Sequence, residues 1–131
     1  MIKFKLLARL AASVRNSGAK DRLPKGREIQ KIERWIESKD WLCDASLQDA
    51  ADRAGVSKEL FSGYFRKVLG KNFLQWRKWA RIQEAKTLLL KEKEIPTALI
   101  GEAVGINDKS NFRRQFREET GMTPAQWRLK H

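Results

Sequence analysis

The densest group of side chains able to do chemistry lies near the C-terminal end of the sequence. Residues 109–114 hold three cations, a serine and an asparagine around one phenylalanine, and a second phenylalanine follows four residues later. Residues four apart share a helix face, so Phe112 and Phe116 are expected to point inward and the cations outward. Lys and Arg donate hydrogen bonds to guanine in the major groove of DNA. The candidates for reading bases here are Lys109, Ser110, Arg113 and Arg114.

An earlier stretch repeats this pattern in a weaker form around Phe61 and Phe65. Its outward positions include Gly63, which has no side chain, and Glu59, which is acidic. Glu59 has one specific use in a DNA groove, because it can accept a hydrogen bond from a cytosine amino group. We therefore expect the later stretch to read more of the base sequence. The candidates for base reading in the earlier stretch are Lys58, Glu59 and Ser62.

Further basic residues follow each of these stretches. Contacts to phosphates position a protein on DNA without reading its sequence, and Lys and Arg commonly make them. The alternative is that these side chains form only a solvated helix surface. The candidates for phosphate contacts are Arg66, Lys67, Lys71 and Arg117.

The side chains most often used in catalysis are scarce. The sequence has one cysteine, Cys43, and one histidine, His131. These numbers exclude an internal disulfide, a cysteine-based zinc site and a two-histidine metal site. Acidic pairs such as Glu92 and Glu94 have no expected pocket. We therefore expect no enzyme activity, no cofactor and no metal site, and we interpret Cys43 as an ordinary, partly buried thiol.

Positive charge dominates the chain and is concentrated at its beginning. The 131 residues include 28 Lys and Arg against 16 Asp and Glu, a net charge of +12, which favours a polyanionic partner. Up to residue 27, eight basic residues accompany one acid, and no apolar run is long enough to cross a bilayer. Apolar residues recur there at helical spacing: Ile2, Leu6, Leu7, Leu10 and Val14. The sequence predicts a basic amphipathic segment and linker over residues 1–27, and a domain over residues 28–131.

The remaining residues are patterned as helices, and no period-2 alternation indicates a strand. Ser46 and Ser57 are expected to cap helices, and Gly55 to end one. Glu33 is expected on the solvent side of the first helix and Leu74 on the inward side of a long one. The expected helices cover residues 28–39, 47–54, 58–68 and about 73–90.

The second half of the domain repeats the first at a spacing of about 50 residues. The turn at 55–57 corresponds to the turn at 105–107, and Gln75-Trp76 corresponds to Gln126-Trp127. Small residues, Ala51 and Gly101, precede each turn and permit two helices to cross closely. Two copies of a helix, a glycine-containing turn and a helix indicate a duplicated helix-turn-helix unit.

Residues 28–131 resemble the C-terminal DNA-binding domain of the AraC/XylS family of bacterial transcription regulators. The resemblance is carried by the stretches Ser46–Gly70, Arg81–Leu89, Ala103–Phe112 and Phe116–Pro124. It implies an all-α fold with two helix-turn-helix subdomains, at about 46–70 and 96–121, joined by a long linker helix at about 73–90. It also implies double-stranded DNA as the partner, with the two units in successive major grooves. RNA polymerase, and an N-terminal sensor or dimerisation domain, are further partners that the resemblance implies.

Two residues of the second unit depart from the family pattern. Pro96 and Thr97 stand where the family has a small or apolar start to a helix, and a proline there is tolerated in the first turn. Gly101 replaces the commoner alanine, which is expected to cost about 1 kcal/mol of helix stability.

The sequence leaves several alternatives open for residues 1–27. They can be the start of a stand-alone regulator, the end of a linker in a longer protein, an extra helix on the domain, or a helix at a membrane surface. The expected location is the cytoplasm with the nucleoid, or the inner membrane face if this segment binds lipid. The rival function is a helical protein-interaction or membrane-associated adaptor whose duplicated units do not read DNA.

Overall fold

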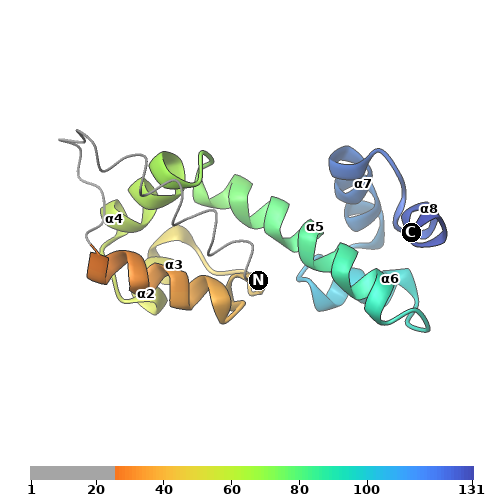
Figure 1. Cartoon of the computed structure of the whole chain (residues 1–131), viewed down its shortest axis with the longest axis horizontal. Coiled ribbons are helices and arrows are strands. Elements are labelled where there is room, and N and C mark those ends of the chain that lie inside the picture. Colours follow the sequence, from red (N-terminus) through yellow and green to blue (C-terminus); the bar gives the residue numbers. More distant parts are fainter. Residues whose placement is uncertain (1–25) are drawn as a thin grey trace. The chain divides into compact units, whose positions relative to one another are not determined.

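The computed structural model describes residues 26–131, which contain helices and no strand. The N-terminal amphipathic segment expected over residues 1–27 lies almost entirely outside the described residues. The elements are α2 (Gly26–Glu37), the 3₁₀ turn η1 (Asp40–Leu42), α3 (Leu47–Ala54), α4 (Lys58–Gly63), the π-helical turn η2 (Tyr64–Val68), α5 (Phe73–Lys91), α6 (Thr97–Ala103), α7 (Lys109–Thr120) and α8 (Pro124–Lys130) (Figure 1).

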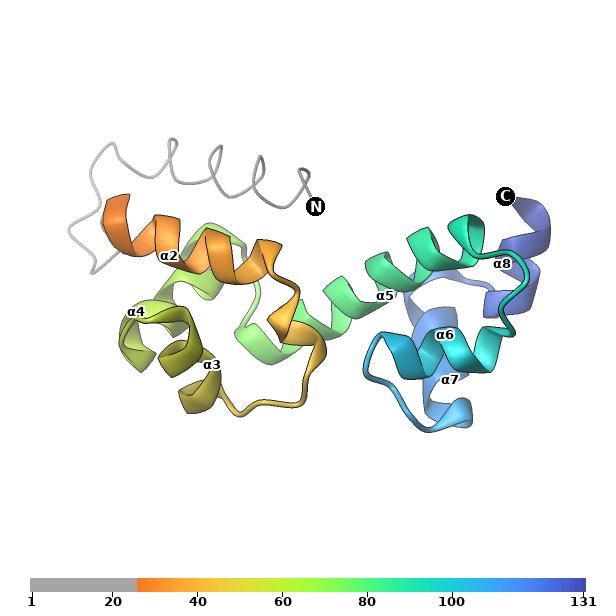
Figure 2. The same ribbon diagram turned by 90° about the horizontal axis from the view of Figure 1, so that it is seen from below.

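The helices form two compact units, and α5 begins in one and runs through the other. Unit one ends at Trp76 and contains α2, α3 and α4, and unit two comprises Arg77–His131 and contains α6, α7 and α8 (Figure 2). Each unit holds one helix-turn-helix, α3 with α4 and α6 with α7. The expected fold, all-α with two such subdomains joined by a long helix, is confirmed.

Aromatic side chains fill the core of unit one. The ring of Phe65 lies 5.0 Å from that of Trp76 and 5.3 Å from that of Phe73, both in edge-on contacts, and Trp41 lies 5.5 Å from Trp76. All four side chains are buried. Edge-to-face rings at these separations add to the burial of apolar area. The buried Trp76 therefore serves packing of the core and is not available for base stacking.

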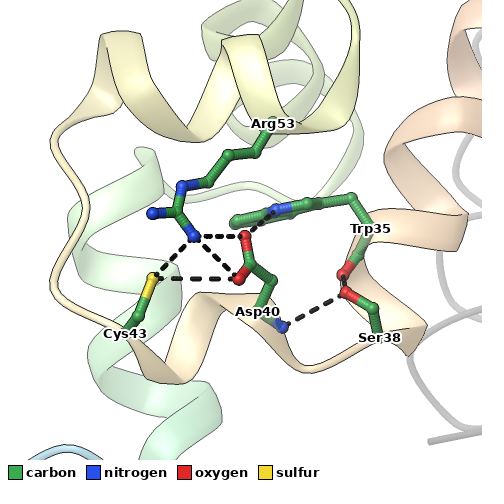
Figure 3. Close-up of polar contacts among 5 residues, drawn as sticks. All are labelled: Trp35, Ser38, Asp40, Cys43 and Arg53. Carbon is green, nitrogen blue, oxygen red and sulfur yellow. Dashed lines mark hydrogen bonds and ion pairs between the residues drawn. The ribbon is translucent and has the colours of Figure 1, made fainter.

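A cluster of polar side chains connects α2, η1 and α3 (Figure 3). The Asp40 carboxylate accepts a hydrogen bond of 2.8 Å from Trp35 Nε1 and bonds of 3.0 and 3.2 Å from Arg53 Nη1. Arg53 Nη1 also lies 3.6 Å from Cys43 Sγ, and the amide of Asp40 donates to Ser38 Oγ. The hydrogen bond and the negative charge of Asp40 raise the pKa of Arg53. The half-exposed Cys43 is thus part of a structural cluster.

Two local expectations in unit one are wrong, and one expected helix changes its type along its length. Glu33 is buried rather than solvated, and its charge acts on Tyr64, whose pKa is raised by burial first and by Glu33 second. Leu74 is 59% exposed, because the inward face of α5 is centred between Phe73 and Trp76 and Leu74 lies about 130° from that centre. The helix expected over 58–68 changes to a π-helical turn after Gly63, where the amide of Leu69 bonds both the i−4 and i−5 carbonyls.

Two contacts between helices hold unit two together: hydrogen bonds from α8 to the end of α5, and a close packing of α6 against α7. The guanidinium of Arg128 in α8 donates to the carbonyls of Leu89 (3.0 Å), Glu92 (3.0 Å) and Ile95 (2.7 Å) at the end of α5 and in the turn that follows. In α6, a Cβ atom on Gly101 would lie 2.8 Å from two ring carbons of Phe112. The glycine therefore gives the ring its space, in agreement with the close helix crossing that a small residue at this position is expected to permit.

Candidate nucleic-acid interface

The start of α7 is fixed by its own cap. The carboxylate of Asp108 accepts a hydrogen bond of 2.7 Å from the amide of Asn111, and Gly121, with φ +80°, ends the helix. Phe112 is 2% exposed and Phe116 is fully buried, where its ring lies 6.0 Å from that of Trp127. The expected inward positions of the two phenylalanines are confirmed, so the opposite side of α7 faces solvent.

Five side chains on that solvent side come together over two turns of α7, and four of them are cations. All five are exposed: Lys109, Ser110, Arg113, Arg114 and Arg117. The first four are the base-reading candidates of unit two, and Arg117 is one of the phosphate candidates. A helix that presents exposed cations along one side has the charge and the hydrogen-bond donors that a DNA groove requires.

Sequence reasoning missed the role of Asn111. Its Oδ1 atom accepts hydrogen bonds from Arg114 Nη2 and, at 3.1 Å, from Gln115 Nε2. The half-exposed amide therefore holds the guanidinium of Arg114 in one orientation. The spacing of an amide and an arginine three residues apart on a helix is the signal that could have predicted this pair.

The equivalent side of unit one has fewer cations. Lys58 and Glu59 are exposed, Ser62 and Gly63 are half-exposed, and Arg66 donates a hydrogen bond of 3.1 Å to Ser62 Oγ. One acid among two cations leaves this side with a lower positive charge than α7. The structure therefore places all the base-reading candidates of unit one on α4, but with less hydrogen-bonding capacity.

The phosphate candidates divide by exposure. Arg66 and Arg117 are exposed, whereas Lys67 and Lys71 are half-buried and engaged with other residues. Arg66 and Lys67 both lie on the π-helical turn η2. Such widened turns occur often at functional sites.

The internal repeat extends to individual hydrogen bonds. The amide of Val56 donates to the carbonyl of Ala51 (3.1 Å), and the amide of Ile106 donates to that of Gly101 (2.8 Å), fifty residues on. The spacing between the two copies then increases by one residue at the next helix cap, which is Ser57 for α4 and Asp108 for α7. The extra residue of the second copy therefore lies in the turn before α7.

Reciprocal side-chain caps also recur, and their glutamines were noted in the sequence as part of the repeat but not as caps. At the start of α5, the side-chain oxygens of Asn72 and Gln75 each accept a hydrogen bond from the backbone N–H of the other residue. Thr123 and Gln126 form the same reciprocal pair at the start of α8. The signal was present as a polar residue followed three positions later by glutamine.

Residues 26–131 offer neither a metal site nor a membrane-spanning helix. This part of the chain contains no group of His, Cys, Asp and Glu side chains that could hold a metal ion. No helix in it combines the length and the apolar composition needed to cross a membrane.

Comparison with known proteins identifies relatives of this fold. A family model described as a helix-turn-helix domain matches residues 50–130. The arabinose operon regulatory protein of Escherichia coli K12 is 37% identical over 91 residues, which cover 68% of this chain and 31% of that protein. The chain thus spans about a third of the length of the curated relatives it matches.

Two solved structures have the same fold. The C-terminal domain of AraT, a response regulator from Geobacillus stearothermophilus, is 25% identical, with a TM-score of 0.67 over 85% of this chain and 89% of that one. The DNA-binding domain of AdpA, solved with a target DNA, has a TM-score of 0.67 at 22% identity, over 76% of this chain and 91% of that one. From the duplicated units, the matching family model and these relatives, the chain belongs to the AraC/XylS family through its double helix-turn-helix domain.

Proposed function

We propose that this chain is a sequence-specific DNA-binding transcription regulator that inserts α4 and α7 into adjacent major grooves. The observation that carries the proposal is the row of exposed cations on α7. This helix is held at its start by a carboxylate cap and on its inner side by two buried phenylalanines. Membership of the AraC/XylS family, and the relatives named as regulators, support the same reading. The site of action is DNA in the cytoplasm.

Within this proposal, the two units have unequal roles. Arg114, held by Asn111, and its neighbour Ser110 one turn earlier lie farthest from the buried side of α7, so they are best placed to meet base edges. Unit one offers Lys58, Glu59 and Ser62, of which only Lys58 is a cation. Unit two therefore reads most of the sequence, and unit one mainly positions the protein on the duplex.

The complete regulator involves further partners in this proposal. RNA polymerase is the natural target of a DNA-bound regulator, and a sensor or dimerisation domain is implied by the family resemblance.

The proposal gives Arg114 a specific and measurable role. Arg114→Gln is expected to lower affinity for the preferred site by about tenfold, and for a scrambled duplex by much less, because a base contact is lost. The measurement is fluorescence anisotropy with both duplexes at one salt concentration. Arg117→Gln is the matched control, since it removes the same charge from the next turn of α7 and is expected to weaken both complexes equally. Equal losses for Arg114→Gln on both duplexes would contradict base reading by Arg114.

A further inference from the structure

Unit two contains a surface cavity of about 320 Å³ where α7 meets the beginnings of α6 and α8. Its polar lining comes from three helices: Thr97 from α6, then Lys109, Ser110 and Arg113 from α7, and Thr123 at the start of α8. Two cations and three hydroxyl groups thus surround one hollow, and none of its lining residues is acidic.

The two cations of this cavity are not neutralised by the protein. Within residues 26–131, neither the Lys109 ammonium nor the Arg113 guanidinium has a hydrogen-bond or ion-pair partner, and both side chains are exposed. Two like charges beside one cavity repel each other, and an anion between them removes that repulsion. The cavity therefore favours a compact anion with several acceptor oxygens.

Lys109 and Arg113 are separated from the outermost side chains of α7 by their position around the helix. They stand one turn apart on the flank that adjoins α6 and α8, with Ser110 at the edge of the same cavity, whereas Arg114 is not among the residues that line it. A ligand in the cavity would therefore lie against the Ser110 hydroxyl but to the side of Arg114, which projects farthest from the buried face of α7. Backbone phosphates occupy that lateral position in a duplex whose groove holds a helix.

We propose that this cavity binds one backbone phosphate of DNA, with Lys109 and Arg113 as the charged donors and the hydroxyls of Thr97 and Thr123 as further donors. The inference rests on the proposed DNA binding and deepens it. It gives Arg113 and Lys109 a different role from the base reading that the sequence favours. It also adds Thr97 and Thr123, which the sequence did not single out, to the interface.

Unit one does not have the same set of side chains. At the equivalent positions it retains a lysine, Lys58, but has Leu47 for Thr97, Ser62 for Arg113 and Asn72 for Thr123. The phosphate site is therefore a property of unit two. Lys58→Gln serves as a control that removes a charge from the same helix position in the other unit.

The experiment measures the salt dependence of DNA affinity for the full chain and its variants, on the preferred site and on a scrambled duplex. Arg113→Gln is expected to weaken both complexes by about tenfold and to reduce the slope of log K against log salt by about 1, because one phosphate contact is lost. Thr97→Val is expected to weaken both complexes a few-fold with little change in slope, because it removes a donor without a charge.

A second arm locates the phosphate. On a preferred site in which single phosphates are replaced by neutral methylphosphonates, one position is expected to weaken the wild type by about tenfold and to leave Arg113→Gln unaffected. Additive losses at every position, or a loss for Arg113→Gln confined to the preferred site, would overturn the inference.

These outcomes are distinct from failure of the proposed function. If the wild type shows no preference for any sequence, the regulator proposal fails, while the change in slope on scrambled DNA still tests the phosphate site. A third arm titrates inorganic phosphate into the free protein. Saturable binding of free phosphate by the wild type, with no change in the DNA slope for Arg113→Gln, would assign the cavity to a free anion and overturn its assignment to DNA.

Discussion

Arg128→Ala is expected to lower the free energy of unfolding of unit two by about 3 kcal/mol. The guanidinium of Arg128 donates three hydrogen bonds to carbonyls that lie 33–39 residues away in the sequence. The last carbonyls of a helix have no partner within the helix, so the guanidinium satisfies them, and without it the carbonyl of Glu92 keeps only the hydrogen bond from the amide of Ile95. The half-exposed position allows water to replace part of the interaction, so the expected loss is well below the sum of three separate bonds.

The measurement is hydrogen exchange of the backbone amides together with urea unfolding. Protection in α6, α7 and α8 is expected to fall, and protection in α2 and α3 is expected to remain. Arg128→Lys keeps the positive charge but cannot direct three donors at once, so it is expected to recover less than half of the lost stability. Full recovery by lysine would show that charge, and not the fork of donors, stabilises this turn.

Gly101→Ala is expected to lower the free energy of unfolding of unit two by about 2 kcal/mol, although alanine is the better helix former. The added Cβ would lie 2.8 Å from two ring carbons and 3.1 Å from the Cβ of Phe112, a side chain that is 2% exposed. Because Phe112 is packed near its attachment to α7, the ring cannot turn aside. The strain therefore outweighs the gain in helix propensity of about 1 kcal/mol.

A second substitution tests this explanation. Gly101→Ala combined with Phe112→Leu is expected to be less unstable than the sum of the two single changes, because a smaller side chain makes room for the methyl group. The readout is the coupling energy from urea unfolding of the four proteins. A stabilised Gly101→Ala variant, or strictly additive effects, would refute the close contact as the reason for glycine.

The sequence predicted those features of the fold that depend on near neighbours or on repetition. The caps at Ser46 and Ser57, and the turn at Gly55, follow from residue types and from spacings of two to four residues. The inward phenylalanines of α7 follow from helical periodicity, and the double helix-turn-helix follows from the repeat.

The features that the sequence did not predict depend on contacts between distant elements. Nothing near Arg128 indicates that its guanidinium reaches the end of α5. The burial of Glu33 depends on how α2 packs in unit one, where its charge acts on Tyr64 from another element, and the exposure of Leu74 depends on which face of α5 unit one covers. A small residue at Gly101 was expected to permit a close helix crossing, but its partner, Phe112, could not be named because it lies on a different helix.

The candidate site shows the same division. The exposure of the cations on α7 could be predicted from the two inward phenylalanines. Which of these cations would contact bases and which would contact phosphates could not be predicted. The pairing of Arg114 with Asn111 and the cavity beside Arg113 separate two arginines that are adjacent in the sequence. That separation depends on the positions of α6 and α8.

The most direct test of the central claim is selection of bound sites from a randomised duplex pool of about 30 base pairs at about 0.15 M salt, where nonspecific binding is weak. The account predicts one strongly enriched half-site, a weaker one about 10 base pairs away, and loss of the strong half-site in a repeat with Arg114→Gln. A pool that shows no enrichment with the wild-type chain would contradict sequence-specific DNA binding by this protein.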